Sequence, residues 1–477
     1  MIDNDEFRKF AHEVADWMAD YYKNIEDLPV KPDVQPGEIM ASLPNHPPVE
    51  GEAIPAIMQD FKSKILPGMT HWQSPNYYAY FPANASYPSL LAEMLTATLA
   101  AQCMIWDTSP SAAELEEQMM KWLIEMTGLP DHWSGVIQDG ASTATLTSIL
   151  TAREQKTNYD INNNGFSEGN HFRIYCSTEA HSSIEKSAKI AGIGRNNVVK
   201  VPVDKDLAMI PEALEKVIID DTENGKVPLA VVAAIGTTGT TAVDPISAIG
   251  RICSKHKVWF HVDAAYAGTA LILPEYRWMI EGINNADSFV FNPHKWMFTH
   301  FDCTAYFIKD SEALVRTFEI LPEYLKTFSR GKVNDYRDWG IPMGRRFRAL
   351  KLWFVIRNFG VKGIQEKLRS HISIASKLES WINDDPDFEL MSKRMFNVVC
   401  FRYNPKSNTE GQDLNLLNEH LEKKLNDSGK LFLTHTKVVG SYTLRMVVGQ
   451  TYVEEPHVKS AWVQIRTTAF MLDLSGL

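Results

Sequence analysis

HVDAAYAG at residues 261–268 and NPHKW at residues 292–296 decide the fold. Each motif follows or completes a short apolar run, VWFHV or SFVFN, and each carries one charged side chain, Asp263 or Lys295. The spacing between these two residues corresponds to about one strand–helix–strand unit. We therefore expect Asp263 and Lys295 to face one cleft from neighbouring connections of a parallel sheet.

The region from about 170 to 310 supports this interpretation, because short apolar runs alternate there with stretches of helical spacing. Such alternation predicts an α/β fold with a mainly parallel central sheet covered on both faces. Ligands of such sheets bind beyond the carboxyl ends of the strands, so residues just after each strand carry the functional weight. The apolar runs are FRIYCS, NVVKVPV, LAVVAAIG, VWFHVDAA, SFVFN and TAYFIK.

The flanking regions follow other patterns. Residues 5–24 have apolar positions at helical spacing, and a proline-rich connector follows at 28–55, so we expect a helical arm that lies across a partner subunit or folds back on its own chain. After about residue 375, strand-like and helix-like stretches predict a small α+β domain. The predicted domains are an N-terminal helical arm (1–84), a large cofactor-binding α/β domain (85–374) and a small C-terminal α+β domain (375–477).

Composition excludes several classes of protein. The chain has 477 residues, with 48 basic and 59 acidic side chains and a net charge of −11, which argues against binding to nucleic acid or to an anionic membrane. Its five cysteines are far apart and form no CxxC pair, which favours reduced thiols in a cytoplasmic protein over disulfides or a metal site. The start of the sequence resembles no signal peptide. The uncharged stretch 227–243 is typical of a buried strand and loop rather than a membrane span.

A lysine and an aspartate at one cleft match what pyridoxal 5'-phosphate requires. The lysine forms a Schiff base with its aldehyde, and the carboxylate keeps the pyridine nitrogen protonated. Taken singly, these residues also suit ordinary roles, since most lysines are exposed and an aspartate after a strand often caps a helix. Gly140, Ala141 and Ser142 precede an apolar helical stretch, which suits either a phosphate site or a serine cap.

Further motifs identify a resemblance that runs through nearly the whole chain. The sequence resembles the group II pyridoxal-phosphate decarboxylases, the family of aromatic-L-amino-acid decarboxylase. That family has the fold of the pyridoxal-phosphate-dependent transferases (fold type I). The matching segments are HWQSPNYYAYFP (71–82), GVIQDGAS (135–142), EAHSSIEK (179–186), HVDAAYAG (261–268), NPHKW (292–296), LPEYLK (321–326) and GRRFRALKLWF (344–354).

The resemblance implies a role for each matched residue. The implied catalytic residues are Lys295, His181, Tyr324 and Asp263. The implied cofactor-binding residues are Ala141, Ser142, His181, Thr238, Asp263, Ala265, Asn292, His294 and Lys295. In this family the histidine stacks on the cofactor ring, and the tyrosine reprotonates the α-carbon after CO2 leaves. A phenylalanine at that tyrosine position accompanies aldehyde-forming relatives, so Tyr324 with His181 favours simple decarboxylation.

The resemblance also implies an aromatic substrate and a homodimer with its active site at the interface. The implied substrate-binding residues are Trp72, Tyr80, Phe81, Pro82, Met104 and Gly344, the last two completing the site of the other subunit. Ala83, Gln102 and Met104 depart from catechol-accepting animal members. The expected substrates are tryptophan, 5-hydroxytryptophan, phenylalanine, tyrosine or DOPA, and the expected products are the amine and CO2.

Two alternatives remain open. The same scaffold can act as an aromatic aldehyde synthase or as a decarboxylase of acidic amino acids. An acidic substrate would require extra cationic side chains among the residues of the range 72–104 that are expected to line the substrate pocket, and the sequence has none there. The other alternative is a non-catalytic binding protein on a nucleotide-type fold. The absence of GxGxxG after an early strand argues against dinucleotide binding.

Overall fold

The computed structural model describes residues 2–167, 169, 171–320, 332–406 and 413–474. They form two compact units. Unit 1 comprises Met1–Pro82, Ile374–Met391 and Val399–Leu477, and unit 2 comprises Ala83–Ser373 and Ser392–Val398, apart from the residues outside these ranges of description.

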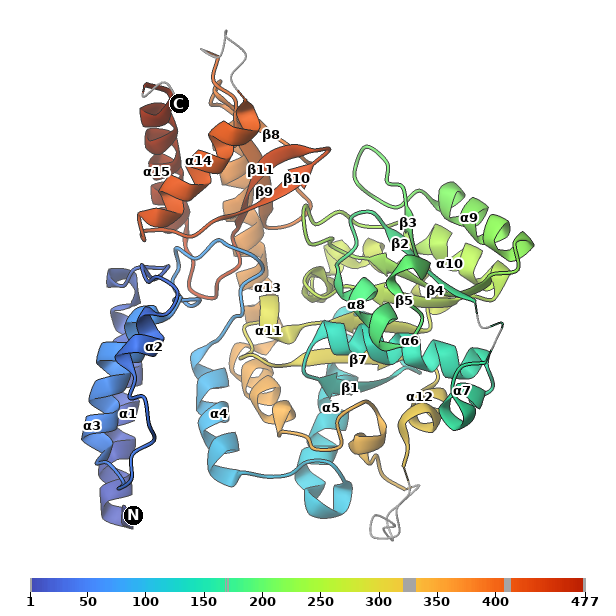
Figure 1. Ribbon diagram of the computed structural model, residues 1–477, viewed down its shortest axis with the longest axis horizontal. Helices are drawn as coiled ribbons and strands as arrows, with labels where there is room; N and C mark the ends of the chain where they lie inside the picture. The colour runs from blue at the N-terminus through green and yellow to red at the C-terminus, as the bar shows by residue number, and fades with distance from the viewer. Residues whose placement is uncertain (1, 168, 170, 321–331, 407–412, 475–477) are drawn as a thin grey trace. The chain divides into compact units, whose positions relative to one another are not determined.

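Unit 2 is built on a seven-stranded sheet in the order β1-β7-β6-β5-β4-β2-β3 (Figure 1). The strands β2 to β6 pair in parallel, whereas β7 is antiparallel to both β6 and β1. The strands are β1 (Ser134–Gln138), β2 (Phe172–Ser177), β3 (Val198–Val201), β4 (Val227–Ala234), β5 (Trp259–Asp263), β6 (Ser288–Phe291) and β7 (Thr304–Ile308).

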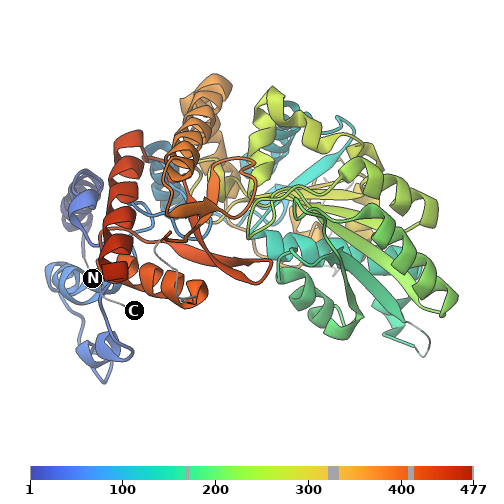
Figure 2. The same ribbon diagram turned by 90° about the horizontal axis from the view of Figure 1, so that it is seen from above.

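Helices cover both faces of this sheet (Figure 2). Successive side chains of β2 point to opposite faces of the sheet, and both faces are covered. On one face Ile174 and Cys176 pack in the core with α6 and α8. On the other face the hydroxyl of Tyr175 donates to Asp221 in α9 at 2.9 Å. The helices are α4 (Tyr87–Leu99), α5 (Pro110–Thr127), α6 (Ala141–Lys156), α7 (Asp160–Asn164), α8 (Ser183–Ile190), α9 (Pro211–Glu223), α10 (Ile246–His256), α11 (Pro293–Trp296) and α12 (Ser311–Phe318). A long helix, α13 (Arg348–Asn383), continues into unit 1 and is interrupted at Gly360.

Unit 1 combines the two ends of the chain. Its small sheet has the order β10-β11-β9-β8, and its core is formed by apolar side chains such as Phe401, Leu421 and Trp462. The elements are α1 (Asn4–Lys23), α2 (Glu38–Ser42), α3 (Ile54–Asp60), β8 (Phe388–Leu390), β9 (Val398–Tyr403), α14 (Leu414–Asp427), β10 (Thr434–Val438), β11 (Ser441–Val447) and α15 (Glu455–Leu474). None of the helices within the described ranges has the length and apolar character needed to cross a membrane.

The predicted fold class is confirmed: a mainly parallel sheet, a helical N-terminal region and a small C-terminal α+β part. The run TAYFIK forms a strand as expected, but one that runs against its neighbours. A parallel connection needs a crossover of a dozen or more residues, usually a helix that spans the sheet. Residues 292–303 contain only the one-turn helix α11, so the chain turns back at the same edge. All five cysteines are buried.

Candidate active site

The carboxyl ends of five strands share one edge of the unit 2 sheet. Strands β2, β4, β5 and β6 are mutually parallel, and β1 has the same direction as β6 because both are antiparallel to β7. This edge therefore carries the nine residues predicted to bind the cofactor. They are Ala141 and Ser142 after β1, His181 after β2, Thr238 after β4, Asp263 and Ala265 at the end of β5, and Asn292, His294 and Lys295 after β6.

Asp263 is held by its own turn. Its Oδ1 atom accepts a hydrogen bond of 3.0 Å from the Ala265 amide, and its carbonyl oxygen accepts one of 2.9 Å from Ile235. The Ala265 carbonyl in turn accepts the Asn292 amide at 2.9 Å, which ties the β5 turn to the segment that contains Lys295. Among the described residues, Oδ2 of Asp263 has no hydrogen-bond donor. The partly buried carboxylate thus keeps one acceptor oxygen for a ligand.

The backbone around Lys295 is fixed on both sides. Its amide donates to the Asn292 carbonyl at 2.9 Å, and its carbonyl accepts the side-chain amide of Asn84. The next residue, Trp296, is fully buried, stacks on Tyr266 with ring centroids 5.1 Å apart and donates to His371 at 3.1 Å. A lysine on such an anchored turn has a defined starting point for its side chain, which is itself partly buried.

The pKa of His181 indicates that the side chains of His181, Asp263 and Lys295 lie close together at this edge. Desolvation lowers the pKa of its imidazole below the ordinary value, and Asp263 raises this pKa while Lys295 lowers it. Its Nδ1 atom accepts a hydrogen bond of 3.1 Å from the Ser183 amide. At neutral pH the ring is therefore neutral, with its proton on Nε2.

The start of α6 and the α11 turn carry groups suited to an anion. Helix α6 begins at Ala141, where backbone N–H groups and the exposed hydroxyl of Ser142 favour a phosphate. Asn292 is buried and its Oδ1 accepts the Thr304 hydroxyl at 2.9 Å, which leaves its amide group oriented as a donor. His294 accepts the Cys303 amide at Nδ1, and burial together with Lys295 lowers its pKa to about 3, so Nε2 carries a proton.

The remaining predicted residues fall in three places. Met104 and Gly344 lie in unit 2, and Gln102 is close to Gly344, since a β-carbon added there would be 3.2 Å from Nε2 of Gln102. Trp72, Tyr80, Phe81 and Pro82 lie in unit 1, where Trp72 stacks near Tyr80 with ring centroids 6.2 Å apart. Tyr324 and the segment LPEYLK lie outside the described residues. Thr238 is exposed beyond β4.

Three supporting residues escaped the sequence-based prediction. Asn84 binds the Lys295 carbonyl, Thr304 orients Asn292, and Gln102 adjoins Gly344 and accepts the Arg345 amide at 2.7 Å. Asn84 lies two residues after the end of the matched segment 71–82 and has 1% of its surface exposed, so an asparagine close to that segment was the available signal. Gln102 attracted notice only as a departure from catechol-accepting relatives.

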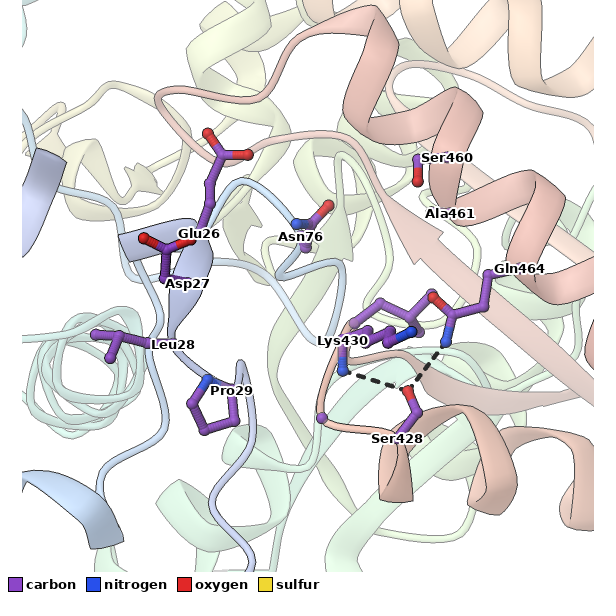
Figure 3. Close-up of a pocket in the computed structure, with 12 residues that line it drawn as sticks. Glu26, Asp27, Leu28, Pro29, Asn76, Ser428, Lys430, Ser460, Ala461 and Gln464 are labelled. Carbon is purple, nitrogen blue, oxygen red and sulfur yellow. Dashed lines mark hydrogen bonds between the residues drawn. The ribbon is translucent and has the colours of Figure 1, made fainter. Parts of the chain in front are cut away.

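Three hollows of the molecule lie away from this edge. One, in unit 1, has a volume of about 450 Å³, and there Ser428 accepts hydrogen bonds from the Lys430 amide and the Gln464 side chain (Figure 3). The other two, of about 450 and 750 Å³ in unit 2, are lined around Lys257 and around Tyr159. None of the three is lined by a predicted site residue. The candidate active site is therefore identified by its side chains and by its position at the sheet edge, and not by one of these hollows.

These side chains fit pyridoxal phosphate. Its phosphate requires backbone and side-chain donors such as those at the start of α6, its ring nitrogen requires an acceptor such as the unpaired Oδ2 of Asp263, and its aldehyde requires an amine such as Lys295. The neutral His181 ring beside Asp263 and Lys295 offers a flat surface for the pyridine ring.

Comparisons with known proteins agree with this geometry. The model of the pyridoxal-dependent decarboxylase conserved domain matches residues 36–404. The phenylacetaldehyde synthase of Arabidopsis thaliana is 41% identical over 99% of this chain and 97% of its own, and tyrosine decarboxylase 2 of Narcissus pseudonarcissus is 41% identical over 99% and 95%. The crystal structure of Catharanthus roseus tryptophan decarboxylase in complex with L-tryptophan superimposes with a TM-score of 0.93, 39% identity and 99% coverage of each chain. This chain therefore belongs to the pyridoxal-dependent decarboxylase family.

Proposed function

We propose that this protein removes the carboxyl group of an aromatic L-amino acid and releases the amine and CO2. The observation that carries the proposal is the gathering of Lys295, Asp263 and His181 at one sheet edge. Relatives named for tyrosine and tryptophan decarboxylation match nearly the whole chain, which supports an aromatic substrate. The candidate substrates are tryptophan, 5-hydroxytryptophan, phenylalanine, tyrosine and DOPA.

In this proposal the sheet edge holds pyridoxal phosphate. When bound, the cofactor supplies an electron sink for the electron pair left by the departing carboxyl group. Lys295 would hold its aldehyde carbon, and Oδ2 of Asp263 would accept a hydrogen bond from its protonated ring nitrogen. Ala141, Ser142, Asn292 and His294 would bind its phosphate, while Thr238 and Ala265 would contact it from the segments that follow β4 and β5.

The protein side chains complete the reaction. His181 lies against the cofactor ring, and because its imidazole is neutral it adds no positive charge that would compete for Asp263. Tyr324 donates its phenolic proton to the α-carbon of the substrate after CO2 leaves. A site poor in water would favour loss of the carboxylate, whose charge is less well solvated there.

Trp72, Tyr80, Phe81 and Pro82 are proposed to line the aromatic pocket, and Met104 and Gly344 to complete the pocket of the partner subunit. Two apolar surfaces support a homodimer. Helix α1 has no buried residue, and Phe7 is 61% exposed. Helix α4 exposes Leu91, Leu95 and Leu99 by 56%, 47% and 61%. Apolar side chains gathered in this way favour an interface with another subunit.

We keep the three-domain division (1–84, 85–374 and 375–477) and a cytoplasmic location as further proposals. The boundaries of the compact units at residues 82/83 and 373/374 lie within two residues of the proposed ones, although the first and last segments cluster together in unit 1. The five cysteines are buried and form no disulfide among the described residues, which suits a reducing compartment.

A second candidate function is oxidative formation of an aromatic aldehyde. The 41% identity with a phenylacetaldehyde synthase favours it, whereas Tyr324 favours the amine. The two reactions differ in their products, because aldehyde formation consumes oxygen and releases ammonia.

The test is to incubate the purified protein with pyridoxal phosphate and a panel of aromatic and acidic L-amino acids, and to measure CO2, amine, aldehyde and ammonia. We expect CO2 and amine in equal amounts from aromatic substrates only, and loss of both in Lys295→Ala together with the absorption band of the lysine-bound cofactor. Tyr324→Phe is expected to shift products from amine towards aldehyde. Product from glutamate or aspartate alone would overturn the aromatic assignment, and the lack of any cofactor band would overturn the enzymatic one.

A further inference from the structure

A chain of hydrogen bonds lies behind the carboxylate that ends β5. The Trp259 indole donates to Ser148 Oγ at 2.9 Å, Ser148 Oγ lies 2.8 Å from Ser288 Oγ, and Ser288 Oγ lies 2.8 Å from His261 Nδ1. All four residues are buried, three of them with no exposed surface, and they come from β5, α6 and β6. His261 is two residues before Asp263, so both side chains lie on the same face of β5.

The hydrogen bonds have a preferred direction. An indole N–H can only donate, so Ser148 accepts from Trp259 and has its own proton to place. Ser288 Oγ, 2.8 Å away, accepts that proton, and the Ser288 proton is then directed to His261 Nδ1; the Tyr306 hydroxyl lies close to both serines. The proton of His261 then lies on Nε2, a buried atom that has no hydrogen-bond partner within the described part of the chain.

Electrostatics connects this ring to Asp263. Burial lowers the pKa of His261 to about 4, whereas Asp263 and the backbone of Ser288 raise it. The titratable groups that face the ring are Asp263 on β5 and Tyr306 on β7, whose centroid is 6.3 Å away and whose own pKa is raised by burial. A histidine beside a carboxylate would otherwise tend to take up a proton and pair with it. Here the Ser288 hydroxyl occupies the lone pair that would accept that proton.

We propose that Trp259, Ser148 and Ser288 hold His261 as a neutral ring, and that His261 is a positioning residue which reserves the charge of Asp263 for the ring nitrogen of the cofactor. The inference rests on the proposed role of Asp263. His261 acts through Asp263 and touches neither cofactor nor substrate.

The test compares two ligands in cofactor-free protein. One is pyridoxal phosphate, and the other is its analogue with CH in place of the ring nitrogen. The ratio of their dissociation constants cancels every contact that the two share. At the acidic end of the stable pH range, we expect Ser288→Ala to bind pyridoxal phosphate about tenfold more weakly than wild type does. A tenfold change in the dissociation constant corresponds to the loss of about one hydrogen bond. Binding of the analogue should stay unchanged. The difference between Ser288→Ala and wild type in binding pyridoxal phosphate should shrink at alkaline pH, because His261 is neutral there even without the Ser288 hydroxyl.

Controls separate this role from a structural one. Ser177→Ala is matched, because Ser177 is a fully buried serine at the end of β2 whose hydroxyl has no partner among the described residues. It should leave the ratio unchanged. Ser148→Ala breaks the chain one link farther away and should change the ratio in the same direction, so it decides the matter if Ser288→Ala does not fold.

Four results are informative. Equal weakening of both ligands, or a ratio that stays at the wild-type value at every pH, would overturn the positioning role. An equal change in Ser177→Ala would do the same. If Asp263→Asn in folded protein leaves the ratio unchanged, Asp263 is not the partner of the ring nitrogen, and the proposed function itself fails at that residue.

Discussion

Replacement of Glu116 by glutamine tests how much the buried ion pair between Glu116 and Arg345, the residue after Gly344, stabilises the protein. Arg345 donates to both carboxylate oxygens of Glu116, at 3.1 and 2.6 Å, and to the Ile137 carbonyl at 2.6 Å, while Glu116 accepts the Ile137 amide at 2.8 Å. The two charged side chains are only 6% and 4% exposed. The pair thus joins α5, β1 and the segment that follows Gly344.

The magnitude follows from this burial. Breaking a buried ion pair by removing one partner costs about 3–5 kcal/mol, because the remaining charge has no counter-ion. Glutamine keeps one oxygen as an acceptor, so we expect Glu116→Gln to lie near the lower limit, about 3 kcal/mol. At about 2–4 °C per kcal/mol for a large domain, the unfolding temperature should fall by about 6–12 °C.

The matched control is Glu117→Gln on the same helix. Glu117 pairs with Lys121 at 2.7 Å, but these side chains are 40% and 64% exposed, and such surface pairs contribute about 0–1 kcal/mol. The assay is thermal unfolding of both variants and wild type, followed by circular dichroism with saturating pyridoxal phosphate. A Glu116→Gln midpoint within about 2 °C of the Glu117→Gln midpoint would refute the reasoning, since the pair would then behave as a surface contact.

Two further predictions concern pH and backbone geometry. Burial lowers the pKa of His371 to about 3, below its unfolded value near 6.5, so its contribution to stability is present above about pH 6.5 and is lost as pH falls towards 3. His371→Gln, which can still accept from Trp296, should therefore reduce the fall in unfolding temperature between pH 7 and pH 5, and an unchanged fall would contradict this. Gly236→Ala should destabilise by about 2–4 kcal/mol, because φ is +86° and the new β-carbon would lie 2.6 Å from that of Ala267. Gly225→Ala, with φ +69° and open space, should cost only about 1 kcal/mol in denaturant unfolding, and equal losses would exclude the packing argument.

The sequence predicted those features that depend on local patterns. Apolar runs bounded by helical stretches located β2 to β7, and the rule that ligands bind at carboxyl ends placed Asp263 and Lys295 at one edge. The direction of β7 was missed, because strand periodicity is the same in both directions.

Contacts between distant segments were also missed. Asn84 meets the Lys295 carbonyl and Glu116 meets Arg345 across more than 200 residues of chain. No periodicity signals such pairs, because burial and packing in the folded sheet bring them together. The role of Tyr324, which lies outside the described residues, stays a prediction.

The position of β1 has a consequence for synthesis of the protein. Ser134 to Gln138 pair with Ile308 to Thr304, and β7 is the one strand that pairs with β1 in the described part of the chain. Strand β1 therefore stays unpaired until the ribosome has added the residues between 138 and 304. At common elongation rates that interval is about 10–30 s. An apolar strand that waits so long with free backbone groups is a target for chaperones or for mispairing with another nascent chain. The start of α6, which we propose to bind the cofactor phosphate and which closely follows β1, consequently takes its final place only late in translation.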